Sequence, residues 1–542
     1  MSIYRVGIDF GTSQTKICSV NTISPNQFIF HKFTESKNYF LPSSIKLNEN
    51  STCSFGLNEP NLIRYFKMKA LFDENKNYEI IESKNKAIEI ESLTQPELEK
   101  YPEICCILYL AYCILDVKES FNVKKRIPII KEKVTEELTI QKPKIGFLSR
   151  FFGKLKKENK ESPTEYEILY TNPHEYVFTI GIPTQYDHTS EEHKRRSKQY
   201  EMLYLSVKLA ENVNNKKGIV VSKLIELLAI IQSDYHKLLH KKYLNEQFYI
   251  NNCLYVIAET TAGIIPVKDE MQKELNTTPD NYQALHKFSE TNMGNYITMD
   301  VGAGTTDISF FKFYLIKGQI KMKYYASKSI ALASNVLILK YLDTDNLEKI
   351  FDFDIKNIDA LKWRRVQRNI REQLFNIIRC QESQLYFRVS IIFNNSPRKY
   401  WDCEFPIAKG CKVYGGGSRF SEFNSGQLML DNGGHHDFNQ ALQTFTELKV
   451  FIKPNESKDK LRGKLYDCKG KPLNDTDEMD TILRSLDILN IALGLAYVDF
   501  NNRPDGENGW IEMERLPNDP QLLGDIGMAN YDIFNRDWIG NN

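Results

Sequence analysis

The sequence predicts an α/β protein in which one strand-turn-strand hairpin is built twice. The two copies, residues 9–17 and 300–308, share Asp, Gly, Thr and Ile when they are aligned without a gap. In each copy an apolar segment, residues 4–8 or 296–299, leads into the acidic residue, and a second apolar segment follows the small-residue turn. A supersecondary unit that recurs within one chain indicates an architecture of similar parts.

The turn of each hairpin is suited to an anion. It carries no bulky side chain, so its backbone N–H groups can close on a phosphate. The hydroxyl groups of Thr12, Ser13, Thr305 and Thr306 add hydrogen-bond donors. The acidic residue before each turn cannot bind phosphate, but it can hold Mg²⁺ or its waters beside the phosphate. Two such hairpins that face each other would clamp the polyphosphate of a nucleotide together with its metal ion.

Both copies resemble the phosphate motifs of the actin-like ATPase superfamily, which includes the DnaK-type (heat-shock 70) chaperones, actin, MreB, FtsA and the sugar kinases. Residues 7–13, Gly-Ile-Asp-Phe-Gly-Thr-Ser, are closest to the chaperone form, and residues 300–308 are close to both the FtsA and the chaperone forms. One copy alone is a weak signal, because glycine-rich hairpins occur in many sheet proteins. The repetition with the acidic residue in the same register makes it a strong one.

The superfamily has three further motifs in a fixed order, and the chain has a match for each. Residues 257–265 (IAETTAGII) resemble the connecting helix, residues 412–419 (KVYGGGSR) resemble the glycine turn at the adenosine, and residues 491–497 (IALGLAY) resemble the small-residue helix that follows. Residues 178–186 (FTIGIPTQY) are similar to a further chaperone element, a strand that ends in proline. The resemblance therefore covers most of the chain and is closest to the chaperone branch.

This resemblance implies a two-lobed actin/heat-shock-70-like ATPase fold, in which duplicated ribonuclease-H-like lobes of mixed sheets flanked by helices hold ATP in the cleft between them. Lobe I is expected at 1–290 and lobe II, which includes the adenosine turn, at 291–480; a closing helix at 481–500 and a tail at 501–542 follow. Within lobe I we expect an outer subdomain at about 36–100, a lysine-rich insertion at about 121–165 and a helical insertion at about 211–246. The tail is rich in Asn, Asp, Gly and Pro, so we expect it to be irregular.

The resemblance also assigns roles to residues at matching positions. Asp300 stands where family members orient the attacking water, and Glu259 matches the glutamate of the chaperone connecting helix. Asp9 and Asp307 are expected to hold Mg²⁺ through water, although a turn-capping acid is the alternative for either alone. Contacts with the phosphates and the adenosine are expected from Gly11, Thr12, Ser13, Gln14, Gly302, Ala303, Gly304, Thr305, Thr306, Gly415, Gly416, Gly417 and Ser418. Arg371 and Glu372 are further candidates for the adenine pocket.

The lysine that would contact the phosphates has more than one candidate. Lys16 occupies the position of actin's phosphate lysine and is preferred as the catalytic cation, with a solvated lysine at a strand end as the alternative. DnaK-type chaperones take this lysine from the outer part of the first lobe, where Lys67 and Lys69 are nearest. Their surroundings, however, look more like the segment that follows that lysine. Without a lysine on the phosphates, hydrolysis would be slow.

Composition agrees with this class of protein and narrows its partners. A chain of 542 residues with 42% hydrophobic residues can bury a large core and predicts more than one folding unit. The net charge of +1 gives no reason to expect nucleic acid as a partner. Ten cysteines without metal or disulfide spacing, and no signal peptide, favour the reducing cytoplasm. The longest apolar run, residues 104–115, predicts a buried helix because it is too short to cross a bilayer.

One part of the lysine-rich insertion could contact a membrane. Phe147, Phe151 and Phe152 recur with Leu148 and Leu155 at helical spacing among cations, which is typical of a helix that lies on a membrane surface. The short length and embedded position of the segment favour the alternative, a helix that packs on its own domain or on a partner.

The sequence thus predicts an ATP-binding, slowly ATP-hydrolysing, chaperone-like switch whose lobe closure controls the binding of an unidentified protein partner. Fewer than fifty residues follow the last motif, too few for a chaperone's substrate domain and lid. The first alternative is a filament or membrane-associated scaffold protein like actin, MreB or FtsA, although a lysine-rich insertion at a lobe edge would hinder polymerisation. A small-molecule kinase is a weaker alternative, since residues 259–263 and Pro183 match the chaperone branch.

Overall fold

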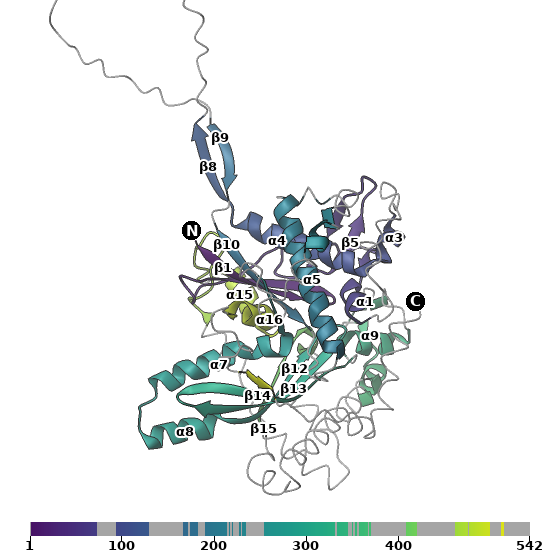
Figure 1. Ribbon diagram of the computed structural model, residues 1–542. Helices are drawn as coiled ribbons and strands as arrows, with labels where there is room; N and C mark the ends of the chain where they lie inside the picture. The colour runs from purple at the N-terminus through teal and green to yellow at the C-terminus, as the bar shows by residue number, and fades with distance from the viewer. Residues whose placement is uncertain are drawn as a thin grey trace, which may run out of the picture.

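The computed structural model is a mixed α/β structure with several sheets and flanking helices (Figure 1). It describes residues 2–72, 94–128, 166–171, 174–182, 190–213, 254–330, 333–344, 408–419, 461–474, 476–498 and 511–513, with a few further residues between 216 and 234 and between 349 and 369. Phe147, Phe151, Phe152, Pro183, Arg371 and Glu372 lie outside the described residues, so the expectations for them stay predictions.

The first hairpin lies within a six-stranded sheet. Its strands run in the order β11-β10-β1-β2-β3, with β4 paired to β2. The bounds are β1 (Ile3–Phe10), β2 (Gln14–Asn21), β3 (Phe28–Phe30), β4 (Leu41–Pro42), β10 (Glu175–Ile182) and β11 (Leu254–Ala258). β1 is antiparallel to β2 and parallel to β10, and its last five residues are all buried. A strand buried on both faces is a central strand covered by helices on each side.

The second hairpin lies within a five-stranded sheet of order β15-β12-β13-β14-β16. The bounds are β12 (Gly294–Val301), β13 (Thr306–Ile316), β14 (Gln319–Ile330), β15 (Ala408–Tyr414) and β16 (Ile511–Met513). β12 is antiparallel to β13 and parallel to β15. In both sheets, therefore, the first hairpin strand lies between a parallel neighbour and its antiparallel partner. β16 corrects one expectation, because residues 511–513 of the tail form a strand rather than irregular chain.

The outer part of the first half holds smaller elements. β5 (Ser44–Leu47) pairs with β6 (Cys53–Phe55) and β7 (Ile63–Arg64), and β8 (Val123–Pro128) pairs with β9 (Tyr166–Thr171). The β8-β9 pair projects from the body in Figure 1 and flanks residues 129–165, where the lysine-rich insertion was expected.

The helices cover the sheets. They are α1 (Phe66–Phe72), α3 (Gln95–Glu99), α4 (Pro102–Ser120), α5 (Ser190–Val213), α7 (Glu259–Thr277), α8 (Tyr282–Asn292), α9 (Ser334–Leu342), α15 (Asp477–Arg484) and α16 (Leu486–Tyr497). α4 contains residues 104–115, and all twelve are buried, so the predicted core helix is confirmed. Among the described residues, no helix is long and apolar enough to span a bilayer.

α7 and α16 cross at very short range between the two large sheets. A Cβ atom built on Gly494 of α16 would lie 1.7 Å from the carbonyl oxygen of Ala262 in α7. On another side of α16, a Cβ atom on Gly7 of β1 would lie 2.4 Å from the Ala492 carbonyl oxygen. Only residues without side chains allow backbones to approach this closely. α16 is thereby the common neighbour of the first sheet and of α7, which leads into the second sheet.

A buried ionic cluster fixes the chain that follows β3 onto α4. The Nε2 atom of His31 lies 2.8 Å from an Asp116 carboxylate oxygen, and the Thr34 hydroxyl donates to the other oxygen at 2.8 Å. Lys216 also donates to Asp116. Burial by itself lowers the pKa of His31, but Asp116 and the neighbouring Cys468 raise it to about 9. His31 and Lys216 hold the pKa of Asp116 below its ordinary range, although burial alone would raise it.

This cluster predicts that stability falls with rising pH. A histidine whose pKa is raised on folding stabilises the native state fully below its ordinary pKa of 6.5, and this contribution is lost as the pH rises through about 9. We expect a loss of about 3 kcal/mol over that window. Scanning calorimetry of the wild type between pH 6 and about 9.5 measures it, with His31→Gln as the non-titrating control. Equal pH slopes for the two proteins would exclude His31 as the cause.

Candidate functional site

The turns of the two hairpins touch. A Cβ atom on Gly304, in the turn after β12, would lie 3.3 Å from the methyl carbon of Thr12, in the turn after β1. Each turn is tight: Gly11 donates its backbone N–H to the Asp9 carbonyl oxygen at 3.1 Å, and Gly302 donates to the Thr305 carbonyl oxygen at 2.8 Å. The structure therefore brings the two predicted phosphate loops, far apart in sequence, into one place.

Neighbouring segments hold both turns in position. The Ser43 hydroxyl donates to the Gly11 carbonyl oxygen at 2.8 Å. On the other side, the Ser334 hydroxyl donates to the Gly302 carbonyl oxygen at 3.1 Å, and the Asn335 N–H donates to Ala303 at 3.0 Å. Sequence reasoning did not identify these three residues, because nothing local in the sequence marks a contact between a loop and a distant turn.

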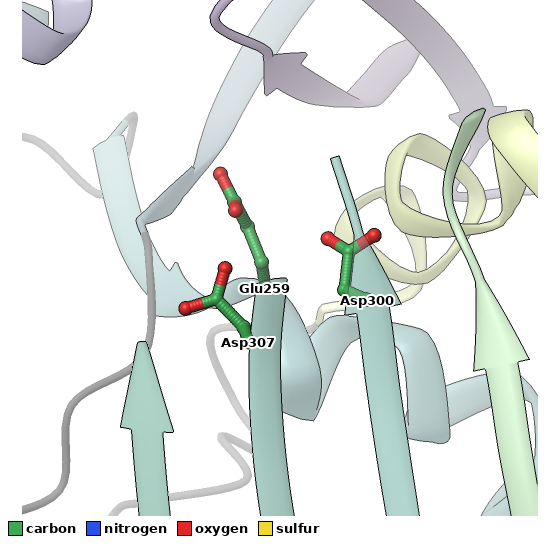
Figure 2. Close-up of side chains that lie close together, drawn as sticks. All are labelled: Glu259, Asp300 and Asp307. Carbon is green, nitrogen blue, oxygen red and sulfur yellow. The ribbon is translucent and has the colours of Figure 1, made fainter. Parts of the chain in front are cut away.

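Three buried carboxylates meet beside the second turn. Glu259 opens α7, Asp300 stands near the end of β12, and Asp307 is its cross-strand neighbour on β13. One carboxylate oxygen from each lies within 4.8 Å of the others, and Figure 2 shows the three side chains together at the ends of these elements. Oxygen ligands at this spacing suit a hard divalent cation.

The two hairpins differ at the same register position. In the first, Asp9 faces Lys16 across the strands, and the Lys16 Nζ atom lies 3.0 Å from an Asp9 carboxylate oxygen. In the second, Asp300 faces Asp307, so an acid stands opposite an acid. The first pair joins a carboxylate to an ammonium group, whereas the second places two carboxyl groups opposite each other. Asp307 thus belongs to the three-carboxylate group, while Asp9 lies outside it and is paired with the lysine that the sequence favoured.

The charge of this cluster shifts the acids toward their protonated forms. Burial raises the pKa of Asp300 well above its ordinary value, and Glu259, Asp9 and Asp307 raise it further. Burial also raises the pKa of Glu259, against the opposing effect of Lys67. A bound cation would stabilise these buried carboxylates, because it favours their charged forms and lowers their pKa values.

Lys67 reaches the site from the outer part of the first half. It is the second residue of α1, is only 3% exposed, and donates to a Glu259 carboxylate oxygen at 3.0 Å and to the Phe10 carbonyl oxygen. Its ammonium group lies 5.4 Å from the centre of the Phe10 ring. Burial lowers the pKa of Lys67, but Glu259 and Asp9 raise it above its ordinary value. Lys67 is therefore charged, and it lies closer to the three-carboxylate group than the sequence indicated.

Lys69, the other outer candidate, does not join the site. It lies two residues further along α1 and forms an ion pair with Glu99 at 3.0 Å, with both side chains partly exposed. The residue before α1, Tyr65, has a φ of 57°, in the left-handed region. That backbone turn sets the start of α1, so Lys67 faces inward while Lys69 faces outward.

The predicted glycine turn packs against the end of β12. Gly415 has a φ of 88°, and a Cβ atom there would lie 2.4 Å from an Asp300 carboxylate oxygen. A Cβ atom on Gly417 would lie 2.4 Å from the Val301 side chain, whereas Gly416 has open space around it. The turn continues into a 3₁₀ helix at Gly416–Arg419, which contains Ser418. The glycines thus let the chain pass directly beside Asp300.

Tyr414 joins this turn to α7. Its ring lies over Gly263, where an added Cβ atom would be 2.5 Å from it, and its hydroxyl donates to the Thr260 carbonyl oxygen at 3.3 Å. Of the other predicted contacts, Thr12, Gly302, Ala303 and Thr305 are partly exposed, Ser13 and Gln14 are exposed, and Thr306 is buried. The described members of the predicted set therefore surround one region.

Comparison with known proteins adds little to this geometry. No protein-family model matches the chain, and no curated protein matches it. Among solved structures, one similar chain is a pCBH ParM non-polymerisable quadruple mutant, with a TM-score of 0.32 and 12% identity over 81% of this chain and 98% of that one. A likeness at this score carries no argument about function, so the functional assignment depends on the site.

Proposed function

We propose that this chain is an actin-like ATPase that binds Mg²⁺ and ATP between two similar lobes and acts as a slow nucleotide switch. The observation that carries the proposal is the meeting of two phosphate-type turns beside the buried group of Glu259, Asp300 and Asp307. The lobe boundary near residue 290, the cytoplasmic location and the protein partner are parts of the same proposal.

The residues present fit the nucleotide and its metal. Two turns of small residues offer backbone N–H groups to a polyphosphate, and Lys16 and Lys67 supply positive charge beside the first of them. Glu259, Asp300 and Asp307 would hold Mg²⁺ directly or through water, with Asp9 nearby. When bound, the metal supplies charge neutralisation for the phosphates. The open space at Gly416 leaves room for the adenosine beside the glycine turn.

The acids provide an acceptor for the proton of an attacking water. Asp300 and Glu259 both have raised pKa values, which brings a carboxylate closer to the strength that proton transfer near neutral pH requires. Asp300 is the stronger candidate because Glu259 is already engaged by Lys67. Lys67 holds Glu259 in place and brings a positive charge toward the region where negative charge develops on the phosphate.

The pairing of Lys67 with Glu259 favours the chaperone-like switch over the filament. The chaperone resemblance places a phosphate-contacting lysine in the outer part of the first lobe. Lys67 comes from that part, and its Nζ atom lies 3.0 Å from a carboxylate oxygen of Glu259 on the connecting helix. The close crossing of α7 and α16 would serve as the hinge between the lobes, since both helices pass between the two large sheets. Closure on the γ-phosphate would then be the signal to a partner.

Phosphate release and light scattering, measured together, test this proposal. A switch releases phosphate slowly, on the order of one turnover per minute or less, without an increase in scattering. Filaments would raise scattering in an ATP-dependent manner and establish the alternative. A kinase would release little phosphate until a small-molecule acceptor is added. Absence of any ATP turnover or binding would reject all three readings.

Replacement of Lys67 should have a much larger effect than the same replacement of Lys69. Lys67→Met removes the buried cation beside the three-carboxylate group, so we expect phosphate release to fall on the order of 100-fold. Lys69→Met removes only a partly exposed ion pair, so its rate should stay within about twofold of the wild type. Single-turnover assays with radiolabelled ATP distinguish the two. Equal rates in the two variants would remove Lys67 from the site.

A further inference from the structure

The glycine of each phosphate turn is held by a serine at the same distance along the chain. The Ser43 hydroxyl donates to the Gly11 carbonyl oxygen at 2.8 Å, and the Ser334 hydroxyl donates to the Gly302 carbonyl oxygen at 3.1 Å. The two glycines occupy equivalent positions when the hairpins are aligned without a gap. In both halves the serine lies 32 residues after the glycine. The internal repeat therefore extends beyond the hairpins to a contact that each of them makes.

The two turns also share a backbone shape. A Cβ atom built on Gly11 would lie 2.3 Å from the Gln14 carbonyl oxygen, and one built on Gly302 would lie 3.0 Å from the Thr305 carbonyl oxygen. Gln14 and Thr305 are again equivalent positions of the repeat. Because the turns have similar shapes, a hydrogen bond to the same carbonyl group has the same consequence in both of them.

Contacts other than its hydroxyl bond fix the position of Ser43. It directly follows β4, which pairs with β2, and its N–H donates to the Ser13 carbonyl oxygen at 2.8 Å. The buried Tyr109 of α4 holds the same segment, since its hydroxyl donates to the Leu41 carbonyl oxygen at 3.1 Å. Ser43 is only 4% exposed. Its hydroxyl is thus shielded from water and available to hold Gly11.

Ser334 opens α9, and the first N–H groups of this helix donate to the second turn. The Ser334 N–H donates to the Gly302 carbonyl oxygen at 3.4 Å, and the Asn335 N–H donates to the Ala303 carbonyl oxygen at 3.0 Å. N–H groups in the first turn of a helix have no acceptor within the helix, so the phosphate turn supplies one. The Gly302 carbonyl group is therefore held by both the N–H and the hydroxyl of one buried residue.

A carbonyl group that is held in place fixes the direction of the next N–H group. A peptide unit is planar and trans, so the C=O of one residue and the N–H of the next point in opposite directions. Holding the Gly11 carbonyl group toward Ser43 turns the Thr12 N–H the opposite way, and the second turn does the same with the Ala303 N–H. Neither N–H donates to another residue in the part of the chain that the structure describes. Each turn thus presents an unused donor at the equivalent position.

We propose that Ser43 and Ser334 are equivalent positioning residues for the polyphosphate of a bound nucleotide, an inference that rests on the proposed function. By holding the two carbonyl groups, they keep the N–H groups of Thr12 and Ala303 directed at the phosphates. The serines act through the backbone of the turns and not by touching the nucleotide. Each serine should therefore contribute to the binding of ATP, and neither should contribute to the binding of adenosine, which has no phosphate.

Calorimetric titration of full-length variants with Mg²⁺-ATP and with adenosine tests this proposal. Ser43→Ala and Ser334→Ala each remove one hydroxyl, and each should weaken ATP binding by about tenfold. The double variant should weaken it by about 100-fold, because the two turns contact the same polyphosphate from different halves of the protein. Adenosine affinity should stay within about twofold of the wild type in all three variants.

Ser44→Ala is the matched control. It removes the neighbouring buried hydroxyl, which donates to the Leu57 carbonyl oxygen at 2.7 Å, outside both turns. Its ATP affinity should stay within about twofold of the wild type, and its Tm should be close to that of Ser43→Ala. Ser334→Thr keeps the hydroxyl and should bind ATP within about threefold of the wild type.

The wild type and the variants test different claims. If the wild type binds no ATP, the proposed function is wrong and this inference falls with it. If the wild type binds ATP and the alanine variants bind it equally well, the inference alone is wrong. It is also wrong if ATP and adenosine binding weaken together, since the serines would then support the fold in general. Ser334→Thr with the affinity of Ser334→Ala would show that the hydroxyl bond does not matter.

Discussion

Gly494→Ala should destabilise the protein strongly, although it adds a single methyl group. The new Cβ atom would lie 1.7 Å from the Ala262 carbonyl oxygen, and the obstacle is backbone rather than a movable side chain. α7 and α16 must then move apart, and α16 is wedged against β1 on its other side, where Gly7 meets the Ala492 carbonyl oxygen. Overpacking typically lowers the free energy of unfolding by about 1–3 kcal/mol, and we expect Gly494→Ala to lie at or above the upper end of that range.

Thermal unfolding measures this effect, and the chain offers a matched control. Gly416→Ala adds the same methyl group where nothing lies within 4 Å, so its Tm should stay close to that of the wild type. If the helix crossing is also the hinge, Gly494→Ala should lower nucleotide-dependent protection from proteolysis as well. A Gly494→Ala protein with an unchanged Tm would show that the two helices do not cross as closely as described.

Asp300→Asn should abolish most of the activity and stabilise the protein at the same time. Asn keeps the shape of the side chain but cannot accept the proton of a water or hold a metal strongly, so phosphate release should fall on the order of 1,000-fold. The substitution also removes a buried charge that Glu259, Asp9 and Asp307 repel. We therefore expect a metal-free Asp300→Asn protein to unfold at a higher temperature than the wild type.

The stabilisation expected for Asp300→Asn should depend on pH, and the raised pKa of Asp300 sets the direction of that dependence. An acid whose pKa is raised on folding binds its proton more tightly in the native state, so raising the pH above its ordinary value of 3.8 destabilises the native state. The stability advantage of Asp300→Asn should thus widen from about pH 4 toward neutrality. Asp269→Asn is the control: burial also raises the pKa of Asp269, on α7, but it is not a member of the three-carboxylate group. That variant should keep its activity.

Two results for Asp300→Asn would contradict this account, and each would contradict a different part of it. Full activity in Asp300→Asn would mean that the three-carboxylate group is not the reaction centre. A lower Tm in metal-free Asp300→Asn would mean that the Asp300 carboxylate is stabilised by partners other than those described, and the argument from repulsion by Glu259, Asp9 and Asp307 would fail.

The sequence predicted the parts of the site that depend on local pattern. An acidic residue at the end of an apolar segment, followed by a turn of small residues, places Asp9 and Asp300 at the ends of central strands, and both hairpins form as expected. The start of α7 at Glu259 and the helix α16 also follow from short motifs. The proximity of Asp300 and Asp307 follows from the pairing within one hairpin.

What the sequence did not predict depends on packing between distant segments. The choice between Lys67 and Lys69 depends on which face of α1 turns toward Phe10 and Glu259, and the surrounding residues alone do not give that rotation. β16 is only three residues long, within a stretch rich in Asn, Asp, Gly and Pro, so it has too few alternations to predict a strand. Its pairing needs the edge of β14, almost two hundred residues earlier in the chain.

Calorimetric titration of ATP into the wild-type protein, with Mg²⁺ and then with the metal chelated, tests the central claim most directly. If two facing turns and the three carboxylates form one nucleotide site, ATP should bind with micromolar affinity, and removal of Mg²⁺ should weaken binding by about tenfold or more. Absence of binding by the folded protein at millimolar ATP, with or without Mg²⁺, would contradict the claim.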